Sequence, residues 1–597
     1  MDPAHESKLD QFNQHATNQS RIYPERLEEG TARILILCRG STSDEIKCNL
    51  KQKVLLAPAL PDKVESYEAL SYVWGEEENS GSVVLCGSHF TVTRNLMEVL
   101  RQLRLPDRDR MLWVDAICIN QRDEEEKATH IKSMNRIYEL AERVIAWLGP
   151  SNDACNSAYW FMNLIQNPDI APTAPVMTLS INNEGTHTEL DSFGKLMNQP
   201  YWSRAWVVQE MMFARSLVIR CGSDEVPYSA LENAFPPDKP ATITFHSDKG
   251  KPMRMHFHGG PKARMPRLDS KQMCPKRFLD CFLDRQCLKR HDNIFAFLNL
   301  LSDDIRQKIP ISYKTDICEV VRHTVRAIIE STQSLYVIVI KGRQAPPSAQ
   351  GDDKWQLDMP SWWPYFATPY ECCSIESQDK PSLFTEKAIV SFIANDRLRV
   401  KGFLIGRVLR PISRHIQHIV GATDWWDQTD MDREWKHYRE CLALGLNGAP
   451  KDIRTKLMSA EAITRTLFAG RGGDLYDALV LMENGTGDAV EGPEVSALRK
   501  IWDIGNSRLV CSFRLDYEVD KELWSSKVTS TARIKNIALV PRTVRQGDVI
   551  CAISGCPTPV VLRERGDCYH VLGEAYVDPG VVGQFEEDVR LRDFTLG

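Results

Sequence analysis

The hydrophobic and polar positions between residues 67 and 225 follow two alternating periods. Short apolar runs predict buried strands at 67–75, 110–120, 143–150 and 216–222. Between them, two segments carry apolar residues at helical spacing: 94–104 has Leu96, Val99, Leu100 and Leu103 on one face, and 123–141 has a stripe of Ile131, Met134, Ile137, Tyr138 and Ala141. Asp123 is the expected N-cap of the second helix. The segment "SVVLCGSHFTVT" adds a hairpin with Gly87 in its turn. Strands that alternate with helices predict an α/β fold with a parallel sheet flanked by helices.

The pattern changes on both sides of this region. Residues 1–60 are mostly polar, with one strand-like run at Ala32–Cys38. After the α/β domain, Pro, Gly, Lys and His are frequent before amphipathic helices begin, and short β-like runs with Gly/Pro turns fill the end of the chain. We therefore predict five segments: an N-terminal extension (1–60), an α/β domain (61–225), an insertion or linker (226–275), a helical segment (276–340), and a mixed α+β C-terminal region with a small β-subdomain (341–597).

Composition limits the function classes. The 597 residues are 43% apolar and 26% charged, which is ordinary for a globular protein of two to four domains. A net charge of -6 does not favour nucleic acid or an anionic membrane as partner. No apolar run approaches the about 18 residues that indicate a membrane span. The 17 cysteines lack zinc-site spacing, so we expect free thiols, no metal and a cytoplasmic location, with the nucleus as the alternative reducing compartment.

One acidic residue does not fit its apolar surroundings. In "YWSRAWVVQEMMFA" (201–214), the helical neighbours of Glu210 are Trp206, Val207, Phe213 and Ala214. Burying an unpaired charge is costly, so this carboxylate is expected to be paired, neutralised, or at the mouth of a site.

Three segments together resemble a known family. "YEALSYVWG", "LWVDAICINQRDEEEKATHIKSMNRIYELAERVIAWLGP" and "YWSRAWVVQEMMFA" are similar, in this order, to the conserved blocks of the fungal heterokaryon incompatibility (HET) domain. "RHDNIFAFLNLL", "MPSWWPYF" and "GDVICAISGCPTPVVLRERGDCYHVLGEAYV" resemble blocks that follow the domain in that family. In the first of these blocks, the Asp-Pro-Arg that the family usually has before the aspartate (here Asp292) is replaced by Lys289, Arg290 and His291.

The resemblance implies self/non-self recognition after hyphal fusion, a form of fungal innate immunity with programmed cell death as its output. The HET domain has been likened to the TIR domain, a flavodoxin-like α/β module. Some TIR domains cleave NAD with one glutamate on a helix, often within a Trp-Cys-x-x-Glu run. Trp206 and Glu210 have the same spacing, although Val207 replaces the cysteine. On this resemblance NAD is a substrate, and no cofactor is expected.

Glu210 is accordingly the candidate catalytic residue, with Trp206 as an aromatic wall beside it. A glutamate in this setting can bind a ribose hydroxyl and stabilise the positive charge that develops as nicotinamide leaves. The alternatives are a structural salt bridge, to Arg204, Arg94 or Arg136, and a contact with a partner protein.

Further candidates come from the ends of the predicted strands. Ligands of open α/β sheets bind at the carboxyl ends of the strands, where we expect Ser71, Tyr72, Trp74, Asp115 and Asn120. The alternatives are core packing for the first three, capping of a loop or helix for Asp115, and a turn for Asn120.

Cys118 invites a different interpretation, as a nucleophile with His130 as its base. It lies between Ile117 and Ile119 in a predicted strand, so we expect a buried core thiol instead.

Two main functions of different kind, and a third possibility, remain open on these observations. One is an enzyme that destroys NAD when it assembles. The other is a non-catalytic module that self-associates through the HET domain or binds an incompatibility partner of unknown identity. A third is a family member that modulates expression or metabolism.

Overall fold

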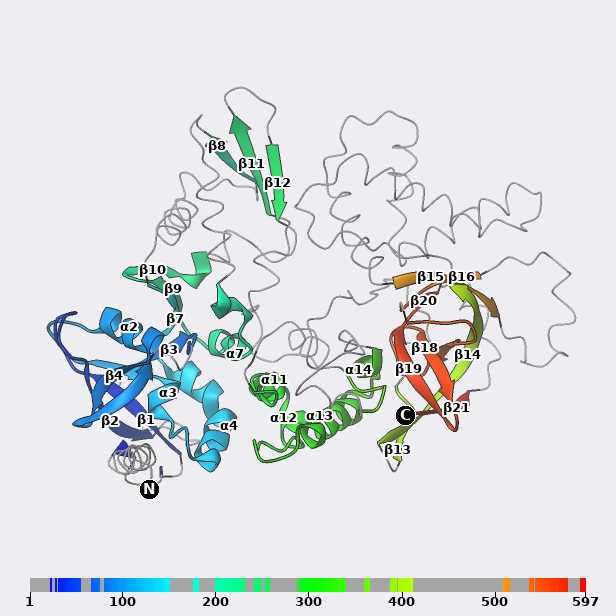
Figure 1. The fold of residues 1–597 in the computed structure, drawn as a ribbon, viewed down its shortest axis with the longest axis horizontal. Coiled ribbons are helices and arrows are strands. Elements are labelled where there is room, and N and C mark those ends of the chain that lie inside the picture. The colour runs from blue at the N-terminus through cyan, green and yellow to red at the C-terminus, as the bar shows by residue number, and fades with distance from the viewer. Residues whose placement is uncertain are drawn as a thin grey trace, which may run out of the picture. The chain divides into compact units, whose positions relative to one another are not determined.

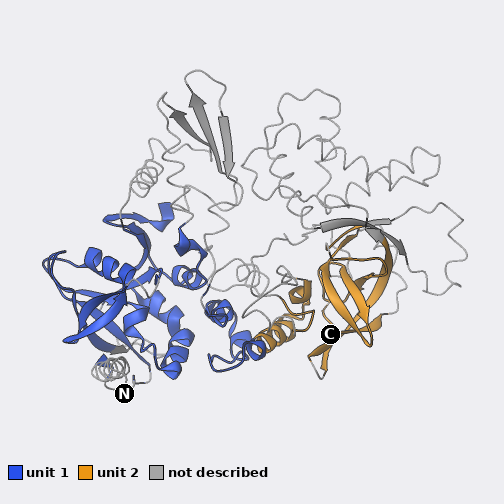
Figure 2. Cartoon of the chain, in the orientation of Figure 1, with its two compact units in different colours: residues 1–274, 285–320 blue, residues 275–284, 321–597 orange. Residues whose placement is uncertain are grey.

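The computed structural model describes residues 22–23, 27–28, 30–54, 66–75, 80–150, 176–181, 199–230, 241–247, 253–257, 287, 289–339, 359–364, 387–393, 396–411, 508–515, 536–541, 543–577 and 591–597. The chain divides into two compact units (Figure 2). The first is Met1–Cys274 with Arg285–Val320, and the second is Pro275–Asp284 with Val321–Gly597. The five-segment division made from the sequence stays a prediction.

The first unit is built on a nine-stranded sheet (Figure 1). In spatial order its strands are β10 (Asp224–Pro227), β9 (Leu217–Cys221), β7 (Val144–Gly149), β3 (Glu68–Tyr72), β6 (Arg110–Trp113), β1 (Thr31–Leu37), β2 (Lys47–Val54), β4 (Ser80–Leu85) and β5 (Ser88–Thr93).

The centre of this sheet is parallel, as predicted. β3 pairs in parallel with β6 on one side and with β7 on the other, and β7 pairs in parallel with β9. β7 is buried along nearly its whole length, which its apolar sequence VIAWLG allows. Numbered along the chain, these four strands have the spatial order 2-1-3-4, so the order reverses between β3 and β7.

Outside this centre most strand pairs are antiparallel, so the predicted parallel sheet is confirmed only in part; β2 and β4 form one further parallel pair. β1 is antiparallel to both β2 and β6, and β4–β5 and β9–β10 are antiparallel hairpins. The β4–β5 turn is Cys86–Gly87, with φ of 51° and 76°, which is the left-handed geometry of a two-residue hairpin loop. Such short connections cannot join parallel strands, which need a crossover.

The described helices of this unit are α2 Arg94–Leu103, α3 Asp115–Cys118, α4 Glu124–Leu140, η1 Pro200–Ser203, α7 Trp206–Met212, α11 Asp292–Phe295, η2 Leu298–Leu300 and α12 Asp303–Arg306. Helices α2 and α4 follow the predicted periodicities. α2 begins after the N-cap Thr93, whose hydroxyl accepts a hydrogen bond from the Leu96 amide at 3.3 Å. Its buried face is Leu96, Val99, Leu100 and Leu103, which confirms the prediction.

α4 also begins where the sequence indicated. The Asp123 carboxylate caps it, accepting from the amides of Glu125 and Glu126 at 3.0 Å. Its buried side contains the predicted stripe of Ile131, Met134, Ile137 and Tyr138, with Ala141 just after the helix.

Strands also lie within the predicted insertion or linker at 226–275. β8 (Val176–Ile181), β11 (Ala241–Ser247) and β12 (Met253–Phe257) form a separate three-stranded sheet, in which β11 is parallel to β8 and antiparallel to β12. The predicted insertion therefore contains regular β structure.

The second unit contains the predicted small β-subdomain. Its strands are β13 (Val390–Ile393), β14 (Arg397–Pro411), β15 (Arg508–Leu515), β16 (Asn536–Pro541), β17 (Val549–Ile553), β18 (Val560–Arg565), β19 (Cys568–Glu574), β20 (Tyr576–Val577) and β21 (Arg592–Leu596). The long strand β14 pairs with β21 and with β17, so β14, β17, β18, β19 and β21 close a ring. The buried side chains of β14, β16 and β17 fill its core.

Helix α14 (Tyr336–Val339) also belongs to this unit, and α13 (Ile317–Thr332) crosses the division between the units. The sequence also predicts a short helix at 156–166 and a helical region from about 424 to 505, and both lie outside the described residues. None of the helices that the structure describes is long and apolar enough to cross a membrane.

The described cysteines are mostly free, as expected. Cys38, Cys48, Cys86, Cys118, Cys287, Cys318, Cys551, Cys556 and Cys568 are free thiols. The expectation is wrong at Cys221, which is disulfide-bonded. Within the described ranges, no group of three or more His, Cys, Asp or Glu side chains is placed to hold a metal ion.

Candidate functional site

Glu210 lies next to the carboxyl end of the central strand β3. α7 carries it, packed against β3 and α4. The Ser71 hydroxyl, near the end of β3, donates a hydrogen bond to the Glu210 carboxylate. The Tyr201 hydroxyl lies 2.7 Å from Ser71 Oγ. Because Ser71 has a single hydrogen, which it gives to the carboxylate, Tyr201 must donate to Ser71.

This carboxylate is buried, with only 2% of its surface exposed. Burial raises the pKa of Glu210 to about 7, because water no longer stabilises the charged form. The nearby Arg204 charge and the hydrogen bond from Ser71 oppose this rise, while Asp115 adds to it. A carboxyl group with this pKa changes its charge near neutral pH, which is a common property of groups at functional sites.

The alternative of a structural salt bridge for Glu210 finds no support in the described part of the chain. There the carboxylate has no ion-pair partner within 4 Å. Arg136 pairs with Glu139 at 3.5 Å, and Arg94 is exposed. Arg204 donates instead to the Tyr72 carbonyl oxygen, close enough to Glu210 to influence its pKa without forming a pair.

A second acidic group lies beside the first. Asp115 is half-buried at the start of α3, and its Oδ2 accepts a hydrogen bond from the Trp74 indole nitrogen at 2.8 Å. Burial raises the pKa of Asp115, and the Arg204 charge opposes the rise. Because Arg204 acts on both carboxyl groups, the structure brings Glu210, Asp115 and Trp74 into one neighbourhood.

Tyr72 and Trp74 complete this neighbourhood. Tyr72 is fully buried, and both Asp115 and Glu210 raise the pKa of its phenol, after burial itself. Trp74 is 39% exposed, one of the few large hydrophobic side chains that are so exposed in the described residues. Its ring is held by Asp115 and presents apolar surface at the carboxyl end of β3.

Trp206 and Asn120 lie among other partners. The Trp206 indole lowers the pKa of the buried Asp292 carboxyl group, which burial raises. Asn120 lies in a turn: its amide donates to Glu126 Oε1 at 2.7 Å, and its Oδ1 accepts from the Arg122 amide at 3.2 Å. These contacts agree with the turn alternative for Asn120.

The run that precedes Asn120 is not a continuous strand, which corrects the sequence prediction. β6 ends at Trp113, and Asp115–Cys118 forms the short helix α3. The Ile117 and Cys118 amides both bond back to the Val114 carbonyl oxygen, which closes a helical turn. Cys118 is buried and burial raises the pKa of its thiol to about 12, so the core-thiol interpretation is confirmed and a nucleophile is disfavoured.

The sequence did not indicate Tyr201 and Tyr138 as site residues. Tyr201 opens the third block, nine positions before Glu210, in the 3-10 helix η1. Tyr138 belongs to the apolar stripe of α4 and its hydroxyl donates to the Leu70 carbonyl oxygen at 3.4 Å, yet it also lowers the pKa of Glu210. A tyrosine within an apolar stripe is a weak signal for such a role, because its ring packs like any core residue.

Comparisons with known proteins match the part of the chain that contains these residues. Residues 67–210 match the family model described as Heterokaryon incompatibility protein (HET). The chain is also 25% identical over 387 residues to "Heterokaryon incompatibility protein 6, OR allele" of Neurospora crassa, an alignment that covers 52% of this chain and 54% of the relative. The chain thus aligns with about half the length of that relative. No solved structure matches this chain. The matched range runs from the start of β3 to Glu210 in α7, and the chain therefore carries a heterokaryon incompatibility (HET) domain at residues 67–210.

Proposed function

We propose that this chain acts in fungal heterokaryon incompatibility, with programmed cell death as its output. The HET domain and the name of the Neurospora crassa relative support the process. The death output rests on the family resemblance of the sequence.

The chemical step we propose is hydrolysis of NAD at the bond between nicotinamide and ribose, with Glu210 as the catalytic residue. The observation that carries this proposal is the state of Glu210: a buried carboxyl group, hydrogen-bonded by Ser71, with a pKa near 7. As the bond breaks, its electron pair leaves with nicotinamide and the ribose carbon becomes electron-poor. A carboxylate that binds a ribose hydroxyl stabilises this centre, and water then adds to give ADP-ribose and a proton.

The position of Glu210 beside the carboxyl end of β3 also supports a ligand site. The parallel strands run in the order 2-1-3-4, which is shared by the first four strands of flavodoxin-like sheets. In such sheets ligands bind beyond the carboxyl ends of the strands, where the order reverses. The reversal here falls between β3 and β7, and Ser71 and Trp74 lie at or just beyond the end of β3. The likeness to TIR domains is an analogy of fold, so the argument depends on the site residues.

The burial of Glu210 adds a condition. At 2% exposure the carboxylate does not reach a substrate in the present conformation. We propose that self-association through the HET domain moves the covering residues and opens the site, so that the resting protein is inactive. A conformational change of this kind is a common way to gate an active site.

The test is to incubate the purified full chain with NAD over a range of protein concentrations and to measure nicotinamide release. Wild type should release nicotinamide, with a rate per molecule that rises with concentration, and Glu210→Gln should not. Glu68→Gln is the matched control. Like Glu210, Glu68 is a poorly exposed acid, but it lies at the start of β3, away from Ser71, and pairs with Arg110 and Arg143. This control should keep the activity.

The same variants expressed in a fungal host separate this proposal from a non-catalytic one. If Glu210→Gln remains as toxic as wild type and the cell's NAD does not fall, the domain acts by binding a partner and the enzymatic proposal is refuted.

A further inference from the structure

The HET domain of this chain is completed by a strand that lies outside the family match. The match begins at residue 67, whereas β1 covers Thr31–Leu37. β1 nevertheless lies inside the sheet, between β6 and β2, with Leu35 opposite Leu112. It thereby lies beside β6, the strand that leads into α3.

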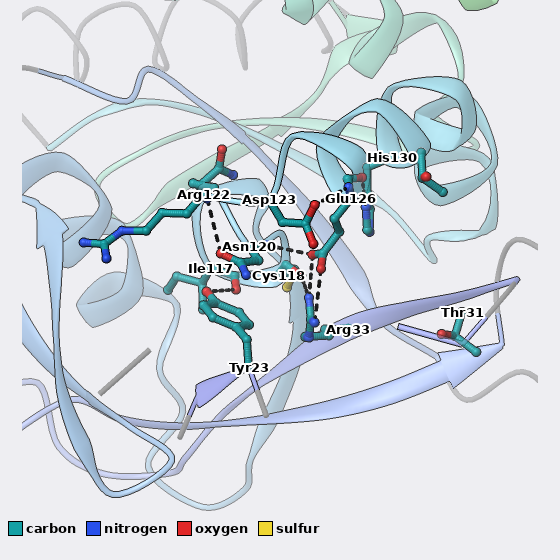
Figure 3. A network of polar contacts seen from close by, with 12 residues as sticks. Tyr23, Thr31, Arg33, Ile117, Cys118, Asn120, Arg122, Asp123, Glu126 and His130 are labelled. Atoms are coloured by element: carbon teal, nitrogen blue, oxygen red, sulfur yellow. Dashed lines mark hydrogen bonds and ion pairs between the residues drawn. The ribbon is translucent and has the colours of Figure 1, made fainter. Parts of the chain in front are cut away.

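Arg33 is the charged residue of this strand, and it is buried. Its Nη1 and Nη2 bind Glu126 Oε1 and Oε2 of α4 at 2.6 and 3.3 Å, as Figure 3 shows. Both side chains are nearly inaccessible, at 4% and 6% of their surface. Arg33 also donates to the carbonyl oxygen of Cys118 at 3.3 Å, and Glu126 Oε1 accepts from the Asn120 amide. The ion pair thus holds the end of α3 and the turn after it.

Tyr23, in the N-terminal part of the chain, also contacts the last residues of α3. Its ring covers the Arg33 guanidinium at 4.8 Å, and its hydroxyl donates to the carbonyl oxygen of Ile117 at 2.8 Å (Figure 3). The carbonyl groups at the end of a helix lack partners within it, so a cation and a hydroxyl at that end stabilise it. α3 has only four residues, so its position depends strongly on these external contacts.

The other end of α3 belongs to the candidate site. Its first residue is Asp115, whose carboxylate holds the Trp74 ring. A helix of one turn transmits a displacement at its last residues to its first, because the turn is closed by hydrogen bonds from 117 and 118 back to 114 and from 119 to 115. Tyr23 and Arg33 therefore act on Asp115 from outside the site, through the backbone of α3.

We propose that Tyr23 and Arg33 form an N-terminal latch of positioning residues, which fixes α3 so that Asp115 holds Trp74 in place for the reaction at Glu210. The part that concerns turnover rests on the proposed NAD cleavage, and the part that concerns the position of α3 does not.

The experiment compares two tyrosine-to-phenylalanine variants of the full chain. Tyr23→Phe removes the hydroxyl that binds α3 and keeps the ring over Arg33. Tyr67→Phe is the control. The buried Tyr67 hydroxyl also donates to a helix carbonyl oxygen, that of Ile137 at 2.5 Å, but this helix is α4 and not α3. Hydrogen–deuterium exchange followed by peptide mass spectrometry measures the amides of 117–121 in each variant. We expect them to exchange about tenfold faster in Tyr23→Phe and at the wild-type rate in Tyr67→Phe.

Kinetics then test the link to the site. Tyr23→Phe should lower kcat/KM for NAD by about threefold to tenfold, whereas Tyr67→Phe, with a similar loss of Tm, should keep the wild-type value. In an Asp115→Ala background, Tyr23→Phe should have no further effect, because the position it controls has already been lost.

Each outcome decides one part of the proposal. Unchanged exchange at 117–121 in Tyr23→Phe overturns the latch, whatever the kinetics show. Faster exchange with unchanged kcat/KM, or additive effects with Asp115→Ala, overturns the positioning role. If the wild-type chain does not cleave NAD, the turnover part falls with the proposed function, and the exchange result alone decides whether the latch exists.

Discussion

Replacing Glu210 with glutamine should change how the stability of the first unit depends on pH. The pKa of this carboxyl group rises from an ordinary 4.5 to about 7 on folding, chiefly because it is buried. Folded protein therefore binds a proton at Glu210 in a pH range where unfolded protein has released it. Stability from this group is fully present below about pH 4.5 and is lost as the pH rises, and the loss is complete above about pH 7.

The size of the effect follows from the two pKa values. The interval between 4.5 and about 7 corresponds to about 3 kcal/mol, at roughly 1.4 kcal/mol for each tenfold change. Most of it, about 2 to 3 kcal/mol, should appear between pH 5 and pH 8. Glutamine has the same shape and no charge, so Glu210→Gln should lack this loss. We expect the difference in Tm between Glu210→Gln and wild type to increase in favour of the variant by about 4 to 10 °C from pH 5 to pH 8.

Differential scanning calorimetry of both proteins at pH 5, 6, 7 and 8 measures this difference for the transition of the first unit. Glu68→Gln is the control with the opposite behaviour. Ion pairs with Arg110 and Arg143 lower the pKa of Glu68 despite burial, so its contribution is present above the unfolded pKa of 4.5 and lost only in stronger acid. Its difference from wild type should stay constant between pH 5 and pH 8. A constant difference for Glu210→Gln as well would refute the reasoning, because it would mean that Glu210 is ionised throughout.

Three further predictions concern the surroundings of the site and the second unit. Ser71→Ala removes a donor that favours the charged form of Glu210, so the pKa of that carboxyl group should rise further, and the loss of Tm between pH 5 and pH 8 should end at a higher pH. Arg33→Met should destabilise the first unit by about 3 to 5 kcal/mol in chemical denaturation, because it leaves Glu126 charged and unpaired, and adding Glu126→Gln should recover much of the loss. Gly402→Ala should lower the Tm of the second unit only, because a Cβ there would lie 2.4 Å from a carbonyl oxygen of β17; an unchanged second transition in calorimetry would contradict this.

The elements that the sequence predicted correctly are those determined by local patterns. The buried face of α2, the cap at Asp123 and the turn at Gly87 each depend on residues within a few positions of one another. The strands of the parallel core were also predicted, because their apolar runs are long enough to be recognised individually.

The elements that the sequence missed depend on partners far along the chain. Arg33 and Glu126 are 93 positions apart, and Tyr23 and Ile117 are 94 positions apart. Neither contact can therefore be predicted from the spacing of residues within a short segment. α3 was predicted as a strand because its apolar residues continue those of β6. Tyr23 and Arg33 stabilise its helical turn, and the hydrophobic periodicity of the sequence does not predict these contacts.

The comparison of Glu210 with Glu68 shows why the sequence pattern alone does not assign a role to a buried acid. Both carboxylates lie against β3, and in both burial by itself raises the pKa. Around Glu68 two guanidinium groups outweigh burial, and the result is a permanently charged structural acid. The hydrogen-bond donor to Glu210 is the Ser71 hydroxyl and Arg204 forms no ion pair with Glu210, so burial prevails and the pKa stays near 7. A purely structural role would be served as well by the first arrangement, and more stably at neutral pH. The second arrangement reduces stability at neutral pH by about 3 kcal/mol, and this cost favours a functional role for Glu210.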